Sequence, residues 1–127
     1  MKKIIIIISI FFLMLPVEAK RLHPEVEYQT YWCNKNNGIM EYKLSDKTRV
    51  DCLTDTLAVE VDFANKWAEC IGQAIYYGKM TNKQPACLLI MENGEKDLKY
   101  LKRLRRSAYR KGVNMRTFTI KPESLSK

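Results

Sequence analysis

The segment Leu57–Phe63 constrains the fold of this chain more than any other, because apolar side chains occupy every second position along it. Successive side chains of a strand point to opposite faces, so one face of this segment is wholly apolar: Leu57, Val59, Val61 and Phe63. The opposite face carries Ala58 and two acids, Glu60 and Asp62. The pattern predicts a strand, and the helical spacing of apolar residues after it predicts a strand–helix unit.

The remaining segments place this strand in one α/β domain with the element order α-β-β-β-α-β-α-β. Alternation and apolar runs predict strands over residues 39–44, 48–53, 57–63, 86–91 and 115–120. Helical periodicity predicts helices over residues 25–34, 66–79 and 97–111. Three consecutive strands followed by strand–helix alternation predict a mixed central sheet flanked by helices on both faces, with a right-handed crossover through the second helix.

Three residues are predicted to mark helix ends. Gly38 can take the left-handed conformation that closes the first helix, Asn65 can N-cap the second, and Gly112 ends the third. The stripes expected to face the core are Trp67, Ile71, Ala74 and Gly78 in the second helix and Leu98, Leu101, Leu104 and Ala108 in the third. The tail Lys121–Lys127 is expected to fray.

The first nineteen residues have the pattern of a signal peptide. Lys2 and Lys3 precede an apolar run of 12 residues, Ile4–Leu15, which is short for a membrane-spanning helix. Val17–Ala19 then offers a small-residue cleavage site. Cleavage there would leave one domain, residues 20–127, exported to the periplasm or secreted, with membrane contact only through the signal segment. An uncleaved N-terminal anchor is the alternative.

The chain is basic, with a formal net charge of +8, and 20 basic against 13 acidic residues remain beyond residue 19. Such a balance favours a polyanionic partner, either nucleic acid or an anionic membrane.

The four cysteines, Cys33, Cys52, Cys70 and Cys87, allow two interpretations. An exported chain meets an oxidising compartment, and four cysteines allow three disulfide pairings. Cys52 and Cys87, however, lie within apolar strand patterns, where a free cysteine packs as a small buried hydrophobe. We therefore expect mostly buried thiols, and the lack of CxxC spacing gives zinc little support.

Acids on two neighbouring strands form a candidate site. If the strand containing Asp51 pairs with the next as a hairpin, Asp51 can share a face with Glu60 and Asp62. Carboxylates this close repel one another unless a cation or a proton lies between them, and Mg²⁺ or Mn²⁺ suits oxygen ligands. The alternative is an ordinary solvated face of a hairpin.

The following helix adds a polar stripe. Gln73 and Tyr77 are one turn apart, and Lys66 lies two turns before Gln73 on the same side. The stripe borders the apolar face, so it either faces the acids past the sheet edge or forms the polar margin of an amphipathic helix.

In element order and motifs, the chain resembles the PD-(D/E)XK nuclease superfamily, with its restriction endonuclease-like αβββαβ core followed here by an additional C-terminal helix and strand. Asp51 matches the first acid of the family and Glu60 the acid of its (D/E)-x-K motif. Gln73–Tyr77 is similar to the Q-x-x-x-Y motif of its RecB-like branch. The resemblance implies that Gln73 and Tyr77 orient the substrate or the catalytic groups.

The chain departs from the family at one motif position, where Asp62 stands in place of the lysine. Some members supply that lysine from the helix, so the resemblance implies Lys66 as a migrated lysine and Asp62 as a third acid. It also implies an accessory glutamate in the first helix, for which Glu27 is the best match and Glu25 the next.

The last predicted helix carries the densest basic patch of the chain: Lys99, Lys102, Arg103, Arg105, Arg106, Arg110 and Lys111. We expect this patch to hold a nucleic-acid backbone, chiefly through Lys99, Lys102, Arg103, Arg106 and Arg110. A solvated cationic face, or one attracted to anionic lipid, is the alternative.

These patterns lead to a principal hypothesis of an exported nuclease that uses Mg²⁺ or Mn²⁺, acts on nucleic acid (DNA before RNA) and needs no small-molecule cofactor. A catalytically weak or inactive module that binds nucleic acid or protein is the alternative. A membrane-surface protein that uses the basic helix is a third idea. His23, the only histidine, lies outside the predicted elements, so no Ser-His-Asp triad is expected.

Overall fold

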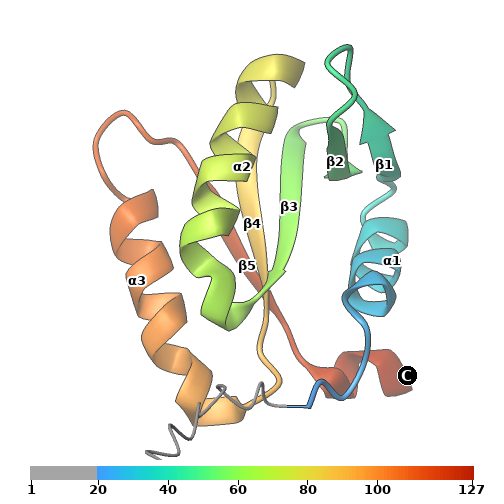
Figure 1. Cartoon of the computed structure of the whole chain (residues 1–127), viewed down its shortest axis with the longest axis vertical. Helices are drawn as coiled ribbons and strands as arrows, with labels where there is room; N and C mark the ends of the chain where they lie inside the picture. The colour runs from blue at the N-terminus through green and yellow to red at the C-terminus, as the bar shows by residue number, and fades with distance from the viewer. Residues whose placement is uncertain (1–19) are drawn as a thin grey trace, which may run out of the picture.

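A computed structural model describes residues 20–127, and the predicted signal segment lies outside the described residues (Figure 1). The described part forms three α-helices: α1 (Glu25–Lys35), α2 (Trp67–Thr81) and α3 (Leu98–Ala108). It forms five strands: β1 (Ile39–Lys43), β2 (Arg49–Leu53), β3 (Leu57–Phe63), β4 (Gln84–Ile90) and β5 (Arg116–Ile120). Short 3₁₀ helices span η1 (Ala64–Lys66), η2 (Gly94–Asp97) and η3 (Pro122–Ser126).

The strands form one mixed sheet in the order β1-β2-β3-β4-β5. The first three pair antiparallel through short turns, whereas β3, β4 and β5 pair parallel. Parallel neighbours need crossovers, which α2 and α3 supply. The predicted α/β class, element order and mixed sheet are therefore confirmed.

Two helices cover one face of the sheet. α2 and α3 lie side by side in Figure 1, and Ala74 and Leu104 from these helices pack with Leu89 of β4. α1 covers the opposite face, where Tyr28 packs against Val61 and other apolar side chains of β3 and β4. Residues 86–90 of β4 are fully buried because helices cover both faces of this strand.

The cysteines form two disulfides, so the expectation of buried thiols was wrong. Cys33 of α1 pairs with Cys52 of β2, with 5.7 Å between their Cα atoms. Cys70 of α2 pairs with Cys87 of β4, with 5.9 Å between their Cα atoms. All four are buried as expected, but each strand cysteine lies beneath a helix that brings a second cysteine to it. One helix on each face is therefore tied covalently to the sheet.

Two predicted helix caps have other roles. The left-handed residue after α1 is Asn37 (φ 53°), not Gly38. A Cβ at Gly38 would lie 2.3 Å from Cys52 Sγ and 2.6 Å from Cys33 Sγ, so the missing side chain makes room for the disulfide. Asn65 lies within η1 and its side chain accepts a hydrogen bond from Arg21, because a 3₁₀ turn precedes α2.

The C-terminal third differs from the expectation in three details. α3 ends at Ala108, three residues before the predicted end, although Gly112 does take a left-handed φ of 91°. Leu98 is 42% exposed, whereas the other three residues of its predicted stripe are buried. The tail forms η3, and Leu125 packs against the α1 side of the core. In residues 20–127, no helix has the length and apolar character needed to cross a membrane.

Replacing Gly38 by alanine is expected to destabilise the oxidised protein. The added methyl would displace one sulfur of a disulfide that closes a loop with a sequence separation of 19 and contributes about 3 kcal/mol. Thermal melting with and without reductant measures the effect, and the Gly38→Ala penalty should shrink after reduction. Gly72→Ala is the control, because nothing lies within 4 Å of its added Cβ. Equal penalties before and after reduction would contradict this role for Gly38.

Candidate functional site

The first acid of the site lies where two strands separate. β2 and β3 pair at Cys52↔Val59 and Leu53↔Ala58, next to their connecting turn. Beyond these pairs, Asp51 Oδ2 accepts a hydrogen bond of 2.7 Å from the backbone N–H of Val61. The Asp51 side chain thus accepts the hydrogen bond that a backbone oxygen of the neighbouring strand would otherwise accept, and this bond fixes the Asp51 carboxyl group against β3.

The other two strand acids are buried. Glu60 is 6% and Asp62 7% exposed, on the face of β3 that α2 covers. Glu60 Oε2 and Asp62 Oδ2 have no hydrogen-bond partner among the described residues. Buried polar atoms are almost always hydrogen-bonded, so these two orphaned oxygens indicate that a proton or a ligand is needed here.

The three carboxyl groups affect one another's protonation. Burial raises the pKa of Asp62 to about 7, with added repulsion from Glu25 and Asp51. Burial also raises the pKa of Glu60 strongly, and repulsion from Asp51 and Asp62 adds to it. The pKa of Asp51 is raised by burial and held down in part by the hydrogen bond from Val61. The site therefore retains protons that isolated carboxyl groups would lose.

Lys66 lies at the rim of this acidic cluster. It ends η1, is exposed, and its positive charge lowers the pKa of both Asp62 and Glu25. It forms no ion pair at 4.0 Å or less, since the one such pair within residues 20–127 joins His23 and Glu27. The ammonium group is thus close enough to influence the acids without being neutralised by them.

Of the two residues predicted on α2, Tyr77 lies in the core and Gln73 on the surface. Tyr77 is 9% exposed and packs with Val50 and Ala58. Burial raises the pKa of Tyr77, and the charges of Glu60 and Asp51 raise it further, so the phenol is within electrostatic reach of these acids. Gln73, one turn earlier, is exposed.

The first helix contributes a different glutamate from the predicted one. Glu27 pairs with His23 Nδ1 at 2.9 Å, outside the acidic cluster. Glu25 instead lies near the site: burial raises its pKa, Lys66 lowers it, and its charge raises the pKa of each strand acid.

The sequence reasoning missed Gln29, four residues after Glu25 and therefore on the same side of α1. Its side chain is almost wholly buried. Its Nε2 donates to the backbone oxygen of Asp51 at 2.8 Å and to Glu41 Oε1 at 2.9 Å. The sequence feature that could have pointed to Gln29 is its spacing of four residues from Glu25, which puts both side chains on one side of α1. Gln29 fixes the backbone that carries Asp51.

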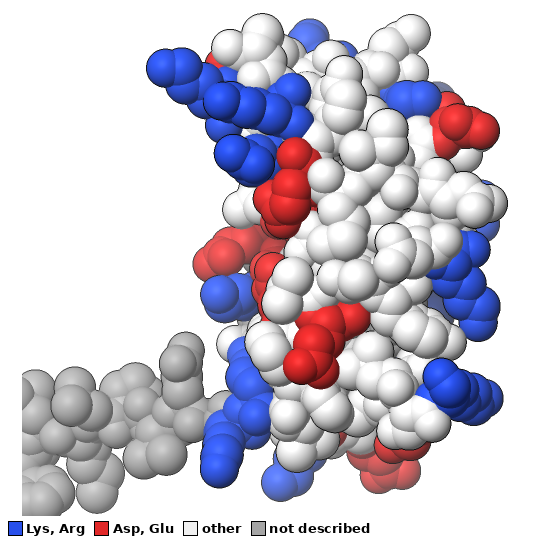
Figure 2. Space-filling view, turned by 90° about the vertical axis from the view of Figure 1, so that its right-hand side faces the viewer, with Lys and Arg blue, Asp and Glu red and all other residues white. Residues whose placement is uncertain are grey.

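The basic residues lie on the other side of α2. All seven are exposed on α3 or just beyond it, and α2 stands between α3 and the site in Figure 1. Lys99 and Arg103 both contact the ring of Tyr100. Figure 2 shows acidic side chains along one edge of the α1 side of the molecule, with basic side chains above and below them.

Within residues 20–127, no three histidine, cysteine or acidic side chains are already arranged as a metal site. The donor set nevertheless suits a hard cation, because the two orphaned atoms are carboxylate oxygens and Asp51 adds a third carboxyl group. Comparisons with protein-family models, curated proteins and solved structures found no match for this chain.

The metal-free protein is expected to lose stability as the pH rises from about 4 to above 7. The folded pKa of Asp62 (about 7) lies above its ordinary value of 3.8, so the folded state holds more protons than the unfolded state across this range, and Glu60 acts in the same direction. Thermal melting in EDTA at pH 5 and pH 8 tests this. Asp62→Asn should flatten the dependence, whereas Asn at the exposed Asp55 should not. A melting temperature that rises toward pH 8 would contradict it.

Proposed function

We propose that residues 20–127 form an exported, metal-dependent nuclease domain of the PD-(D/E)XK type that hydrolyses phosphodiester bonds in nucleic acid. The observation that carries this proposal is the pair of buried, unpartnered carboxylate oxygens on Glu60 and Asp62. The arrangement of the elements supports it: three antiparallel strands, then α2 and a parallel β4, with α1 on the opposite face, follow the order of the αβββαβ core.

The strand acids would hold the metal. Asp51, Glu60 and Asp62 present carboxyl groups, and α2 shields Glu60 and Asp62 from solvent. Bound Mg²⁺ or Mn²⁺ would supply Lewis acidity toward the phosphodiester and the attacking water. Gln29 and the backbone of Val61 hold Asp51 in place from two sides, so this ligand needs no reorganisation.

Lys66 is assigned the role of the motif lysine. Its exposed side chain is near enough for its charge to lower the pKa of Asp62, forms no ion pair within residues 20–127 and can approach a phosphate at the rim. A fixed positive charge there stabilises the negative charge that develops on the phosphate during attack. Tyr77, within electrostatic reach of Glu60 and Asp51, and the exposed Gln73 are assigned the orienting roles that the motif implies.

The basic residues of α3 are assigned to the nucleic-acid backbone. A helix is about 10–12 Å across, so a strand passing over α2 from the acids to α3 would span only a few phosphates. The contacts are electrostatic and carry no sequence preference.

A non-catalytic module that binds nucleic acid is the second candidate. One observation favours it: the buried residue that follows Glu60 by two positions on β3 is Asp62 rather than the motif lysine. Hydrolysis of nucleic acid by the purified protein would support the nuclease, and binding without hydrolysis would support the non-catalytic module.

Purified mature protein is expected to release nucleotides from DNA or RNA with Mg²⁺ or Mn²⁺ and not in EDTA. Lys66→Ala should lower kcat by about 10²–10³, the usual effect of losing one transition-state charge contact. Lys79→Ala, an exposed lysine in the last turn of α2, is the matched control. Turnover that persists in an Asp51→Ala/Glu60→Ala double variant would refute the assignment.

Binding of nucleic acid is expected to depend on salt through α3. In the Asp51→Ala/Glu60→Ala background, Lys102→Ala/Arg106→Ala should reduce the slope of log Kd against log salt by about two units, one for each lost phosphate contact. Fluorescence anisotropy with a labelled oligonucleotide measures the slope. Lys43→Ala/Lys121→Ala removes two exposed lysines elsewhere and should leave it unchanged. Equal slopes in both double variants would exclude α3 from the interface.

A further inference from the structure

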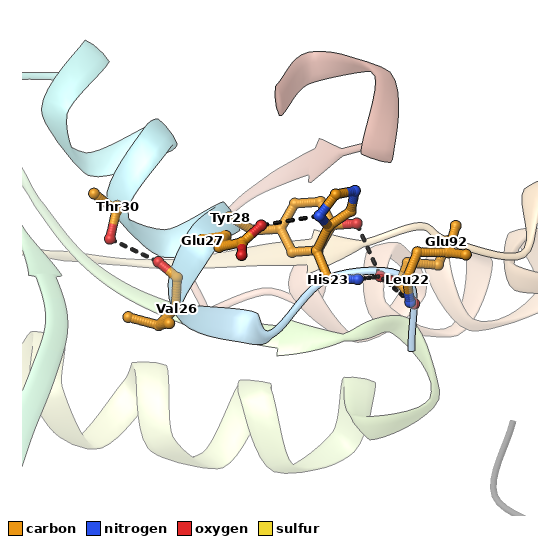
Figure 3. A network of polar contacts seen from close by, with 7 residues as sticks. All are labelled: Leu22, His23, Val26, Glu27, Tyr28, Thr30 and Glu92. Carbon is orange, nitrogen blue, oxygen red and sulfur yellow. Dashed lines mark hydrogen bonds and ion pairs between the residues drawn. The ribbon is translucent and has the colours of Figure 1, made fainter. Parts of the chain in front are cut away.

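The segment before α1 is fastened to the body of the protein, although the sequence gives it no secondary structure. Glu92, two residues after β4, accepts backbone hydrogen bonds from Leu22 and His23, all at 3.1 Å (Figure 3). The same carboxylate accepts a hydrogen bond of 2.8 Å from the hydroxyl of the buried Tyr28. These bonds join residues 64 to 70 positions apart in the chain.

The fastened segment places Arg21 at the end of β3. The Arg21 guanidinium carbon lies 3.7 Å from the ring centroid of Phe63. Its Nη2 donates to Asn65 Oδ1 at 2.8 Å, and Asn65 directly precedes Lys66. A guanidinium group that stacks on a ring and bonds an amide is held in one orientation before any ligand arrives.

Arg21 also lies within electrostatic reach of the acidic site. Its charge lowers the pKa of Glu25, the acid of α1 that influences all three strand acids. It forms no ion pair at 4.0 Å or less with any described carboxylate. A guanidinium has five N–H donors, and the one hydrogen bond to Asn65 leaves the others available.

We propose that Arg21 binds a backbone phosphate of the nucleic-acid strand next to the phosphate at the acidic cluster, and that Glu92 is the positioning residue that keeps Arg21 there. The inference rests on the proposed function. It adds a second cation beside Lys66, with the planar donor geometry that matches two phosphate oxygens. The site thereby includes a residue 30 positions before its first strand acid, supplied by a segment with no regular structure.

The test compares variants of the full chain, expressed and purified after export. Arg21→Met keeps an apolar side chain that can pack on Phe63 but removes the charge. Arg21→Lys keeps the charge but lacks the planar guanidinium group that can bond two phosphate oxygens at once. Glu92→Gln weakens the attachment of the segment without touching Arg21. Lys20→Ala is the matched control, an exposed neighbouring cation for which no contact to the body of the protein is seen in the described structure.

Steady-state cleavage of a labelled single-stranded oligonucleotide with Mg²⁺ gives the first readout. Arg21→Met is expected to raise KM about tenfold to a hundredfold, the range for one charge-assisted contact, with little change in kcat because the neighbouring phosphate is bound equally in ground and transition states. Arg21→Lys should recover part of the loss, Glu92→Gln should show a smaller rise in KM, and Lys20→Ala should match the wild type.

Binding without turnover gives the second readout and separates the two proposals. In the Asp51→Ala/Glu60→Ala background, Arg21→Met should raise the anisotropy Kd for the same oligonucleotide by a similar factor. If no variant or wild type cleaves and Arg21→Met still weakens binding, the nuclease assignment fails while the phosphate contact stands. If the wild type cleaves and Arg21→Met changes neither KM nor Kd, the contact is refuted and the nuclease assignment stands. Should Arg21→Met fail to fold, an unchanged KM in Glu92→Gln would refute the fastening role.

Discussion

Two buried carboxyl groups on β3 and a half-buried one on β2 influence one another beside α2, and the two on β3 each keep an oxygen that no described group satisfies. Burying such groups costs free energy, and their mutual repulsion adds to the cost unless protons or a cation are bound. The surrounding structure offsets that cost: a buried glutamine and a backbone N–H hold Asp51, and disulfides tie α1 and α2 to the sheet. Groups of residues that lower the stability of the folded state in this way are commonly functional sites.

Much of the fold could be predicted because hydrophobic period is a local property. The alternation in Leu57–Phe63 and the unbroken apolar run after residue 85 give β3 and β4 directly, whereas the order of the strands within the sheet is known from the structure alone. Disulfide pairing could not be predicted, because it depends on which helix covers each strand cysteine. The caps at Gly38 and Asn65 were wrong because tertiary contacts, a disulfide and Arg21, determine what these two residues do.

The candidate site was predictable on the strands and less so on the helices. A strand has only two faces, so the acids at positions 60 and 62 had to lie together. On a helix, residues two positions apart point about 200° away from each other, so choosing Glu27 instead of Glu25 selects the opposite side of α1. There is also a physical reason for the proposed lysine to stand at position 66 rather than at position 62. A lysine at position 62 would be nearly as buried as Asp62, and burial disfavours its charge, whereas the exposed end of η1 preserves it.

The two disulfides join consecutive cysteines, first with second and third with fourth, so their covalent loops neither overlap nor enclose one another. A chain whose thiols oxidise in the order in which they emerge reaches the native pairing directly, without reshuffling. Glu60, Asp62 and Lys66 lie between the two loops, on a segment of the site that neither crosslink encloses. The site is thus assembled from two independently closed halves, and its central strand is held only by the sheet and by packing.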